Sequence, residues 1–274
     1  MVAGCNFCAY GEGITSKHSG GNAMSLAGRS ALVSGGSRGI GQGIALAFAK
    51  AGADVAINYR RDEESAQETV AQIQAMGRKS VALQGDASDY ERVKQVVAQA
   101  IQALGKIDIL VSSAGIASRG RYVVDSEVAE FHRVIDTHAF SALHFAKEVI
   151  PHMRQHRRGD IMFISSVGAE ACRAGGAPYA MAKCAMEALA KTLAKEERPR
   201  GIRVNVIRPG LVETEMGRRL AKARFGVDDI RDLYATSAFG RVCQPYDIGN
   251  LAVFLASEEG EYITGQIIAV SGGE

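Results

Sequence analysis

The sequence lacks the features that mark several classes of protein. No apolar run approaches the roughly 20 residues of a membrane-spanning helix, which argues against a membrane protein. Lys and Arg total 32 against 30 Asp and Glu, and the net charge of +2 gives no reason to expect nucleic acid or a membrane surface as a partner. There is also no basic patch or helix–turn–helix signal. The 47% hydrophobic and 23% charged residues are typical of a water-soluble globular protein.

Cysteine is scarce. The five cysteines are an odd number and scattered, which suits free thiols in a reducing cytoplasm. Cys5 and Cys8 have the spacing of half a zinc site or of a redox pair, but no second pair or histidine cluster accompanies them, so we predict no metal site. Residues 1–23 are rich in Gly, Ser and Asn and lack the pattern of a secretory signal. We interpret them as a disordered leader or a cloning-derived segment before a natural start at Met24.

From Ser25 onward, short apolar runs alternate with longer segments of helical periodicity. This alternation predicts one doubly wound Rossmann-type α/β domain over residues 24–274, with a parallel sheet of about seven strands covered by helices on both faces. We expect strands at Ala31–Ser34, Asp54–Asn58, Ser80–Leu83, Ile107–Val111, Ile161–Ser165, Ile202–Ile207 and Ile267–Val270. We expect helices at Ile40–Ala51, Asp62–Met76, Phe131–Met153 and Pro178–Glu197, one that a Ser88/Glu91 capping box begins and Leu104 ends, and one that begins at Pro245.

A glycine-rich turn joins the first predicted strand to the first predicted helix. Glycines at 35, 39 and 41 permit a tight turn and a close approach of the backbone to a ligand. The helix that follows would present free N–H groups and its positive end to a diphosphate. A plain tight turn is the alternative, but the strand–turn–helix context is the one that a dinucleotide-binding motif requires.

The end of the second predicted strand indicates which dinucleotide would bind. NAD-binding folds usually place an acidic residue there to bind the adenosine ribose, whereas residues 58–61 read Asn-Tyr-Arg-Arg, with no carboxylate before Asp62. Arg38 and Arg60 are placed to clamp a 2′-phosphate, which suits the guanidinium fork. We therefore predict NADP(H) as the cofactor; the alternative is that both arginines are solvated surface charges.

Three side chains point to acid–base chemistry. Tyr179 and Lys183 are four residues apart and so share one helix face. A tyrosine has a pKa of about 10, which we expect Lys183 and an oxidised nicotinamide to lower toward the working pH. Ser166 follows the fifth predicted strand at its carboxyl end, where ligands bind in open α/β sheets. It could hold a substrate oxygen beside Tyr179; the alternative is a lysine packed beside a structural tyrosine.

Together these motifs resemble the short-chain dehydrogenase/reductase family, nearest to the ketoreductases similar to 3-oxoacyl-(acyl-carrier-protein) reductase. The resemblance spans about residue 25 to the end and rests on the Gly-x-x-x-Gly-x-Gly turn and on Ser166, Tyr179 and Lys183. It continues in Pro209–Thr214, which matches the family's Pro-Gly loop, and in 262–266 with Gly272-Gly273, which match its C-terminal signature.

The resemblance implies an NADP(H)-dependent oxidoreductase that interconverts a ketone and a secondary alcohol, with Tyr179 as general acid/base. It also implies that Lys183 binds the nicotinamide ribose, that Asp86 contacts adenine, and that Val212 and Thr214 contact the carboxamide. The cofactor-binding residues it implies are Ser34, Gly35, Ser37, Arg38, Gly39, Ile40, Gly41, Tyr59, Arg60, Asp86, Ala87, Ser113, Ala114, Gly115, Tyr179, Lys183, Pro209, Gly210, Val212 and Thr214.

Three positions depart from the family pattern. The family's Asn-Asn-Ala-Gly is 112–115, Ser-Ser-Ala-Gly, and the Asp before the terminal glycines is Ser271. His138 stands where the family has a catalytic-helix Asn that supports a water in the proton relay. We count His138 among the catalytic residues because it could hold a water or relay protons itself, although it could also only fill space. The departures support one alternative function, a catalytically silent NADP(H)-binding sensor or scaffold.

The substrate and the partners stay open. Residues 215–244 match the family's variable substrate lid. A small carbonyl or alcohol compound is expected, either a 3-oxoacyl thioester of an acyl carrier protein or CoA, or a small ketone, sugar or steroid. Arg157 and Arg200 fall where the related reductases bind acidic carrier protein, or are ordinary surface charges. The resemblance also implies a cytoplasmic homotetramer.

Overall fold

The computed structural model describes residues 24–273, and the segment that holds Cys5 and Cys8 lies outside them. The described residues form one parallel sheet with the strand order β3-β2-β1-β4-β5-β6-β7. Its strands are β1 (Ser30–Ser34), β2 (Asp54–Tyr59), β3 (Ser80–Gln84), β4 (Ile109–Ser112), β5 (Gly159–Ile164), β6 (Ile202–Pro209) and β7 (Ile267–Val270). The order reverses between β1 and β4, so the ligand crevice of an open sheet is expected at the carboxyl ends of these two strands.

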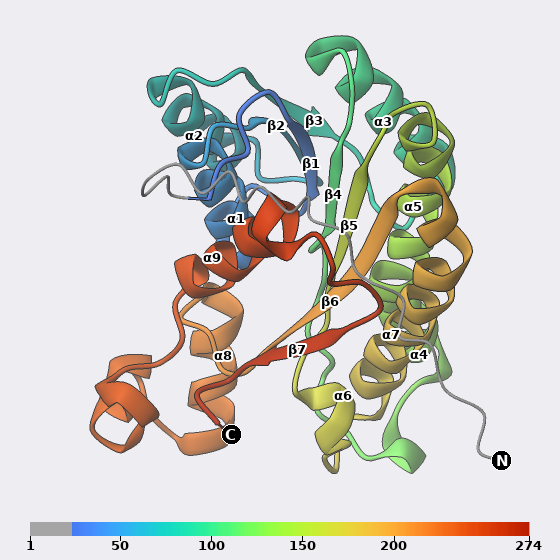
Figure 1. Cartoon of the computed structure of the whole chain (residues 1–274). Coiled ribbons are helices and arrows are strands. Elements are labelled where there is room, and N and C mark those ends of the chain that lie inside the picture. Colours follow the sequence, from blue (N-terminus) through green and yellow to red (C-terminus); the bar gives the residue numbers. More distant parts are fainter. Residues whose placement is uncertain (1–23, 274) are drawn as a thin grey trace, which may run out of the picture.

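Helices cover both faces of the sheet (Figure 1). On one face lie α1 (Gly39–Lys50), α2 (Glu63–Ala75) and α9 (Pro245–Ala256), and on the other lie α3 (Tyr90–Leu104), α5 (Ser141–Met153) and α7 (Ala177–Glu197). The remaining helices are α4 (Val128–Ile135), α6 (Gly168–Ala171) and α8 (Glu215–Phe225). The predicted doubly wound single sheet is confirmed, and the strand ends lie within two residues of the predicted ones.

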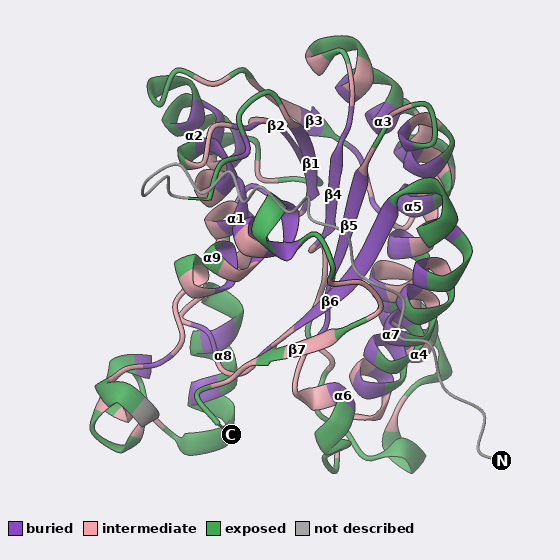
Figure 2. Ribbon diagram, in the orientation of Figure 1, coloured by how far each residue is buried: buried purple, intermediate pink, exposed green. Residues whose placement is uncertain are grey.

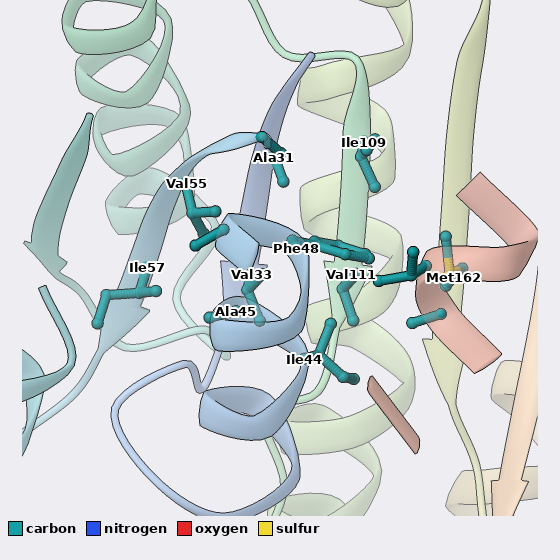
Figure 3. Packing of buried hydrophobic residues seen from close by; sticks show 14 of the residues in the cluster. Ala31, Val33, Ile44, Ala45, Phe48, Val55, Ile57, Ile109, Val111 and Met162 are labelled. Atoms are coloured by element: carbon teal, nitrogen blue, oxygen red, sulfur yellow. The ribbon is translucent and has the colours of Figure 1, made fainter. Parts of the chain in front are cut away.

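The core forms two layers, one on each face of the sheet, because successive strand residues point to opposite faces. Val33 and Val111 pack with Phe48 of α1, as Figure 3 shows, whereas Leu32 and Leu110 pack with Phe145 of α5. The central strands are therefore buried on both sides (Figure 2), which explains their continuous apolar runs.

The helix predicted over Phe131–Met153 is interrupted. It begins earlier, as α4, passes through a π-helical turn at Asp136–Phe140 and continues as α5. A π-turn adds a residue to the helical repeat and often lies at a functional site. The turn contains His138, and periodicity alone did not reveal it.

The predicted capping box at Ser88 and Glu91 is wrong. Asp89 caps α3, because its carboxylate accepts from the backbone N–H groups of Glu91 and Arg92 at 3.0 and 3.2 Å. The hydroxyl of Ser88 instead donates to Asp86 at 2.7 Å. A capping box does occur at α9, between Gln244 and Asp247.

The segment after β6 folds as a small unit beside the sheet. Thr214 caps α8, and Ala221 packs with Ile230 and Val242 in a separate small cluster. Glu213 joins this unit together, since it accepts from the Tyr234 hydroxyl at 2.6 Å. Within residues 24–273, no helix is long and apolar enough to cross a membrane.

Candidate active site

Ser166 and Tyr179 meet at the carboxyl end of β5. Ser166 lies two residues beyond the strand, and Tyr179 lies in the first turn of α7 and hydrogen-bonds with it. The backbone N–H of Gly168 donates to Ser166 Oγ at 3.1 Å. A side chain at Gly168 would lie 3.5 Å from the Tyr179 ring, so glycine allows this segment to pass close to the pair.

The buried environment changes the pKa of both Tyr179 and Lys183. Burial raises the pKa of Tyr179, while its hydrogen bond with Ser166 acts to lower it. Burial lowers the pKa of Lys183 to about 7, against a raising effect of Glu187. We expected Lys183 to lower the pKa of Tyr179, but the pKa of Tyr179 is raised and Lys183 is not among the causes of its shift. The reason is that a lysine with a pKa of about 7 carries only part of a positive charge near neutral pH.

The end of β5 holds the Lys183 side chain near Tyr179. Its Nζ donates to the carbonyl oxygen of Ile164 at 2.6 Å and lies 5.6 Å from the centre of the Tyr179 ring. The side chain is buried. Lys183 is therefore a donor fixed at the end of β5, on the same helix face as Tyr179.

An ion pair between the buried Glu187 and the partly buried Arg208 lies one helical turn beyond Lys183, and the sequence analysis missed it. Glu187 accepts from Arg208 Nη2 at 2.7 Å and from the hydroxyl of Ser165 at 2.5 Å. Arg208 also contacts Glu170 of α6. Glu187 is four residues after Lys183, so the helical repeat could have placed it on the same face; its partners come from other elements and are not evident from local sequence.

His138 fills the space between Tyr179 and the loop that follows β4. Its ring meets the Tyr179 ring edge to face, with 5.2 Å between centroids. Nε2 lies 2.8 Å from the carbonyl oxygen and 3.1 Å from the amide nitrogen of Ile116, and Nδ1 is buried with no hydrogen-bond partner among the described residues. Burial lowers the pKa of His138 well below its ordinary value, with a further contribution from Lys183, so the ring is neutral.

The glycine turn has the shape of a diphosphate cradle. A side chain on Gly41 would collide with the carbonyl of Gly35 at 2.2 Å, and Gly39 has a φ of +59°. The helix α1 that follows has no acidic residue in its first turn and no side-chain cap at Arg38, so its N–H groups are available to an anion. The residues present therefore fit a dinucleotide.

A serine stabilises the loop after β4, where the family pattern differs. Ser34 Oγ accepts from the backbone N–H groups of Ser113 and Ala114 at 3.1 and 3.2 Å. The Ser112 hydroxyl is buried with no partner among the described residues. The hydrogen bonds that hold the 112–115 loop against β1 are thus accepted by a side chain of β1, Ser34.

The Pro-Gly loop closes the other side of the crevice. A side chain on Gly39 would lie 3.3 Å from the methyl group of Thr214, and one on Gly210 would lie 3.0 Å from Ser271. Val212 is buried and forms a bridge with Cys243. Of the other predicted cofactor residues, Ser37, Tyr59 and Ala87 are buried at the same sheet edge, and Ile40 is partly buried beside the core.

The two arginines predicted to bind a 2′-phosphate face carboxylates. Arg38 Nη1 lies 2.9 Å from Glu215 of α8 and 3.6 Å from Asp62, and Arg60 Nη1 lies 3.6 Å from Asp86. Burial acts to raise the pKa of Asp86, but hydrogen bonds from Ser88 and the charge of Arg60 lower it overall.

A cavity of about 390 Å³ adjoins Arg60. Arg61 and Arg92, which the sequence analysis did not select, line it together with Asp89. The cavity is therefore a polar space beside the carboxyl ends of β2 and β3, lined by three guanidinium groups and by the carboxylates of Asp86 and Asp89.

Arg157 and Arg200 lie away from this site. They precede the amino ends of β5 and β6, whereas Ser166 follows the carboxyl end of β5. The two loops lie close together, because a side chain on Gly201 would lie 2.7 Å from the Arg157 carbonyl. Arg200 Nη1 donates to the carbonyl of Glu196 at 3.2 Å. No group of three or more His, Cys, Asp or Glu side chains in residues 24–273 is placed to hold a metal ion.

Comparisons with known proteins agree with this architecture. A family model described as Enoyl-(Acyl carrier protein) reductase matches residues 35–274. The 3-oxoacyl-[acyl-carrier-protein] reductase FabG of Staphylococcus aureus is 36% identical over 246 residues, which cover 89% of this chain and 97% of that protein. A short-chain dehydrogenase from Burkholderia cenocepacia in complex with NADP superposes with a TM-score of 0.82 at 33% identity, covering 90% of this chain and 98% of that one.

A 7α-hydroxysteroid dehydrogenase complexed with NADH and 7-oxo glycochenodeoxycholic acid superposes with a TM-score of 0.84 at 32% identity, covering 91% of this chain and 95% of that one. The chain belongs to the short-chain dehydrogenase/reductase family. It is an oxidoreductase of CH–OH groups, similar to FabG-type ketoreductases, and this part of the sequence prediction is confirmed.

Proposed function

We propose that this protein is an NADP(H)-dependent ketoreductase that interconverts a ketone and a secondary alcohol, with Tyr179 as general acid/base. The observation that supports this proposal most is that Ser166, Tyr179 and the buried Lys183 lie together at the carboxyl end of β5. The site adjoins the glycine turn across the switch point of the sheet.

Each residue of the group has a role that follows from its contacts. Ser166 donates to the substrate oxygen and keeps it beside the Tyr179 hydroxyl, with which it hydrogen-bonds. Tyr179 donates its proton to the developing alkoxide in reduction and accepts it in oxidation. Lys183 titrates near neutrality and so can pass a proton toward Tyr179 or bind the nicotinamide ribose from its fixed place on Ile164.

The buried Nδ1 of His138 can accept a hydrogen bond from a water molecule near the site. The contact of Nε2 with the Ile116 carbonyl, shorter than that with the amide, favours a proton on Nε2, which leaves Nδ1 as an acceptor. We assign to His138 the part that the family gives to Asn, holding the water through which Lys183 exchanges protons.

The bound nicotinamide supplies or accepts a hydride at this site. The cofactor's diphosphate would lie at the glycine turn and the start of α1, its adenine near Asp86, and its carboxamide near Val212 and Thr214. We assign NADP(H) because Arg60, Arg61 and Arg92 are among the residues that line the cavity where a 2′-phosphate would lie. Arg38, which the structure pairs with Glu215, would join them if the 2′-phosphate replaced that carboxylate as its partner.

The substrate is proposed as a 3-oxoacyl thioester or another ketone of apolar skeleton. Met216 and Leu220 of α8 expose apolar side chains on the lid, 215–244, that borders the site. The relatives include an enzyme named for acyl-carrier-protein substrates and one solved with an oxo-steroid conjugate, so both skeletons need testing.

A carrier protein bound at Arg157 and Arg200 would lie at the amino ends of the strands, whereas Tyr179 of the same chain lies at their carboxyl ends. Its acyl chain would therefore have to reach the site of another copy, as a homotetramer allows. We propose this assembly, a cytoplasmic location and one catalytic domain over 24–274.

The test is consumption of NADPH, with NADH in parallel, against ketones and 3-oxoacyl thioesters of CoA and acyl carrier protein. Turnover that is faster with NADPH supports the proposal. Tight NADPH binding without turnover on any of these compounds would favour the silent binding protein instead.

A further inference from the structure

Two cysteines lie on the segments that carry Ser166 and Tyr179, and the proposed reaction does not use them. Cys172 follows the last residue of α6, and Cys184 follows Lys183 on α7. Both residues are exposed. Both sulfur atoms contact one acceptor, the carbonyl oxygen of Ala169, at 3.3 and 3.2 Å. The two thiols are therefore close neighbours, although eleven residues separate them in the sequence.

The backbone at Cys172 brings its thiol to this position. Cys172 has φ 41° and ψ 48°, the left-handed conformation in which a helix usually ends with glycine. A residue with a Cβ rarely adopts this conformation, because the Cβ lies too close to the following carbonyl oxygen. This turn closes α6 with a hydrogen bond from the Cys172 N–H to Gly168 and leaves the side chain beside Ala169.

The charges around Cys184 come from three elements. Burial raises the pKa of the Cys184 thiol, the neighbouring Cys172 and Glu187 raise it further, and Arg208 acts to lower it. Cys184 is therefore mostly protonated at neutral pH, so we assign the first attack, on the free disulfide, to Cys172. The Cys184 thiol then loses its proton as it attacks the mixed disulfide held beside it.

We propose that Cys172 and Cys184 form a reversible dithiol–disulfide site that ties α6 to α7. The oxidant is a low-molecular-weight disulfide such as glutathione disulfide. The Cys172 thiolate attacks one of its sulfur atoms and releases one glutathione thiolate; the Cys184 sulfur then attacks Cys172 Sγ and releases the second. The two cysteines lose two electrons and two protons, and glutathione disulfide becomes two glutathione thiols.

Closure of this bond would restrain the segment that carries Ser166. The cysteines lie at the end of the short helix that follows Ser166 and directly after Lys183. To form a bond, both sulfurs must leave the Ala169 carbonyl and approach each other to about 2 Å. We expect the Ser166–Tyr179 hydrogen bond to change and turnover to fall at least severalfold, and a reducing dithiol to restore it.

The first test is chemical and independent of any substrate. The full-length protein is incubated with glutathione disulfide, alkylated and digested with trypsin. The sequence places the two cysteines in separate tryptic peptides, 159–173 and 184–191. A cross-linked pair of these peptides that disappears on reduction supports the proposal; glutathione retained on either cysteine, or disulfides only between chains, would overturn it.

Cys184→Ser and Cys172→Ser remove one partner each, and Cys243→Ser is the matched control because Cys243 lies in the lid with a different acceptor, Gln244. A Cys5→Ser/Cys8→Ser variant shows that the cross-link does not depend on the N-terminal cysteines. Hydrogen exchange in the peptide 159–173 should slow on oxidation in the wild type and in Cys243→Ser, and not in Cys184→Ser.

This inference goes beyond the proposed function and fails separately from it. An enzyme with no detectable turnover can still form the cross-link and show slowed exchange. An active enzyme in which the cross-link forms without changing exchange or turnover would contradict the restraint on Ser166.

Discussion

His138 and Tyr179 stand edge to face, with an interplanar angle of 85°. His138 comes from the π-helical turn and Tyr179 from the first turn of α7, so the contact joins two helices at the point where the reaction is proposed to occur. The histidine ring also fills the space in front of Gly115, where a Cβ would lie 2.4 Å from Cε1. Its position is therefore set by packing on both sides.

The His138→Phe variant tests the proton-relay role. Phenylalanine keeps a ring in this space but removes Nδ1, and we expect turnover to fall by roughly a hundredfold, within the range of acid–base contributions. His138→Asn should keep turnover within a few fold, since it restores the family's residue. Turnover of the Phe variant equal to that of wild type, with unchanged NADPH affinity, would show that His138 only fills space.

Gly115→Ala tests the packing of His138 separately from catalysis. The added methyl group collides with the imidazole, and overpacking of this kind costs typically about 1–3 kcal/mol of unfolding free energy. In the His138→Asn background the smaller side chain leaves room, so the same substitution should cost measurably less. Urea unfolding of the four proteins gives the coupling; equal costs in both backgrounds would contradict the contact.

Tyr179→Phe should lower turnover by roughly two to four orders of magnitude, because it removes the acid and leaves the ring in place. NADPH affinity, measured by fluorescence of the cofactor, should change little. Tyr90→Phe is the control, since the Tyr90 hydroxyl donates to Glu148 on α5, away from the site. A Tyr179→Phe enzyme with unchanged turnover would remove the assigned role.

The arginines at the 2′-phosphate position make a prediction about cofactor choice. Arg38→Ala/Arg60→Ala should weaken NADPH binding by at least tenfold and leave NADH binding nearly unchanged, because only NADPH carries the additional phosphate. Glu215→Gln should strengthen NADPH binding, since it releases Arg38 from its ion pair at 2.9 Å. Arg121→Ala is the surface control, and equal losses for both cofactors would refute the assignment.

The low pKa of Lys183 predicts a pH-dependent stability. In the unfolded chain this lysine keeps its proton up to a pKa of about 10.5, and in the folded chain only up to about 7. Between these values the unfolded state binds more protons, so stability rises with pH, by at most about 1.4 kcal/mol per pH unit. This contribution is complete above the unfolded pKa and is lost as the pH falls through about 7.

Lys183→Met removes that titration and nearly keeps the length of the side chain. The difference in unfolding free energy between the wild type and this variant should grow in favour of the wild type from pH 7.5 to 9.5, a window inside the two pKa values. Urea unfolding without cofactor measures it. A difference independent of pH would mean that Lys183 is charged when folded.

Much of the fold was predictable because its strands and helices follow from patterns among neighbouring residues. Apolar runs such as those of β1 and β4 and the helical periodicity of α1 are properties of neighbouring residues. The glycines of the turn likewise signal a close backbone approach where they stand. Local patterns were less informative where two residues competed for one role, as at Asp89 and Ser88.

The sequence by itself therefore determined the alternation of strands and helices, the glycine turn and the spacing of Ser166, Tyr179 and Lys183. Only the tertiary structure placed Arg208 on Glu187 and His138 against Tyr179, and it brought the Cys172 and Cys184 thiols to one carbonyl. It also diverted Arg38 to Glu215, 177 residues further along the chain. Such contacts depend on how helices pack across the sheet and on which groups lose water, and no periodicity within a single segment encodes them.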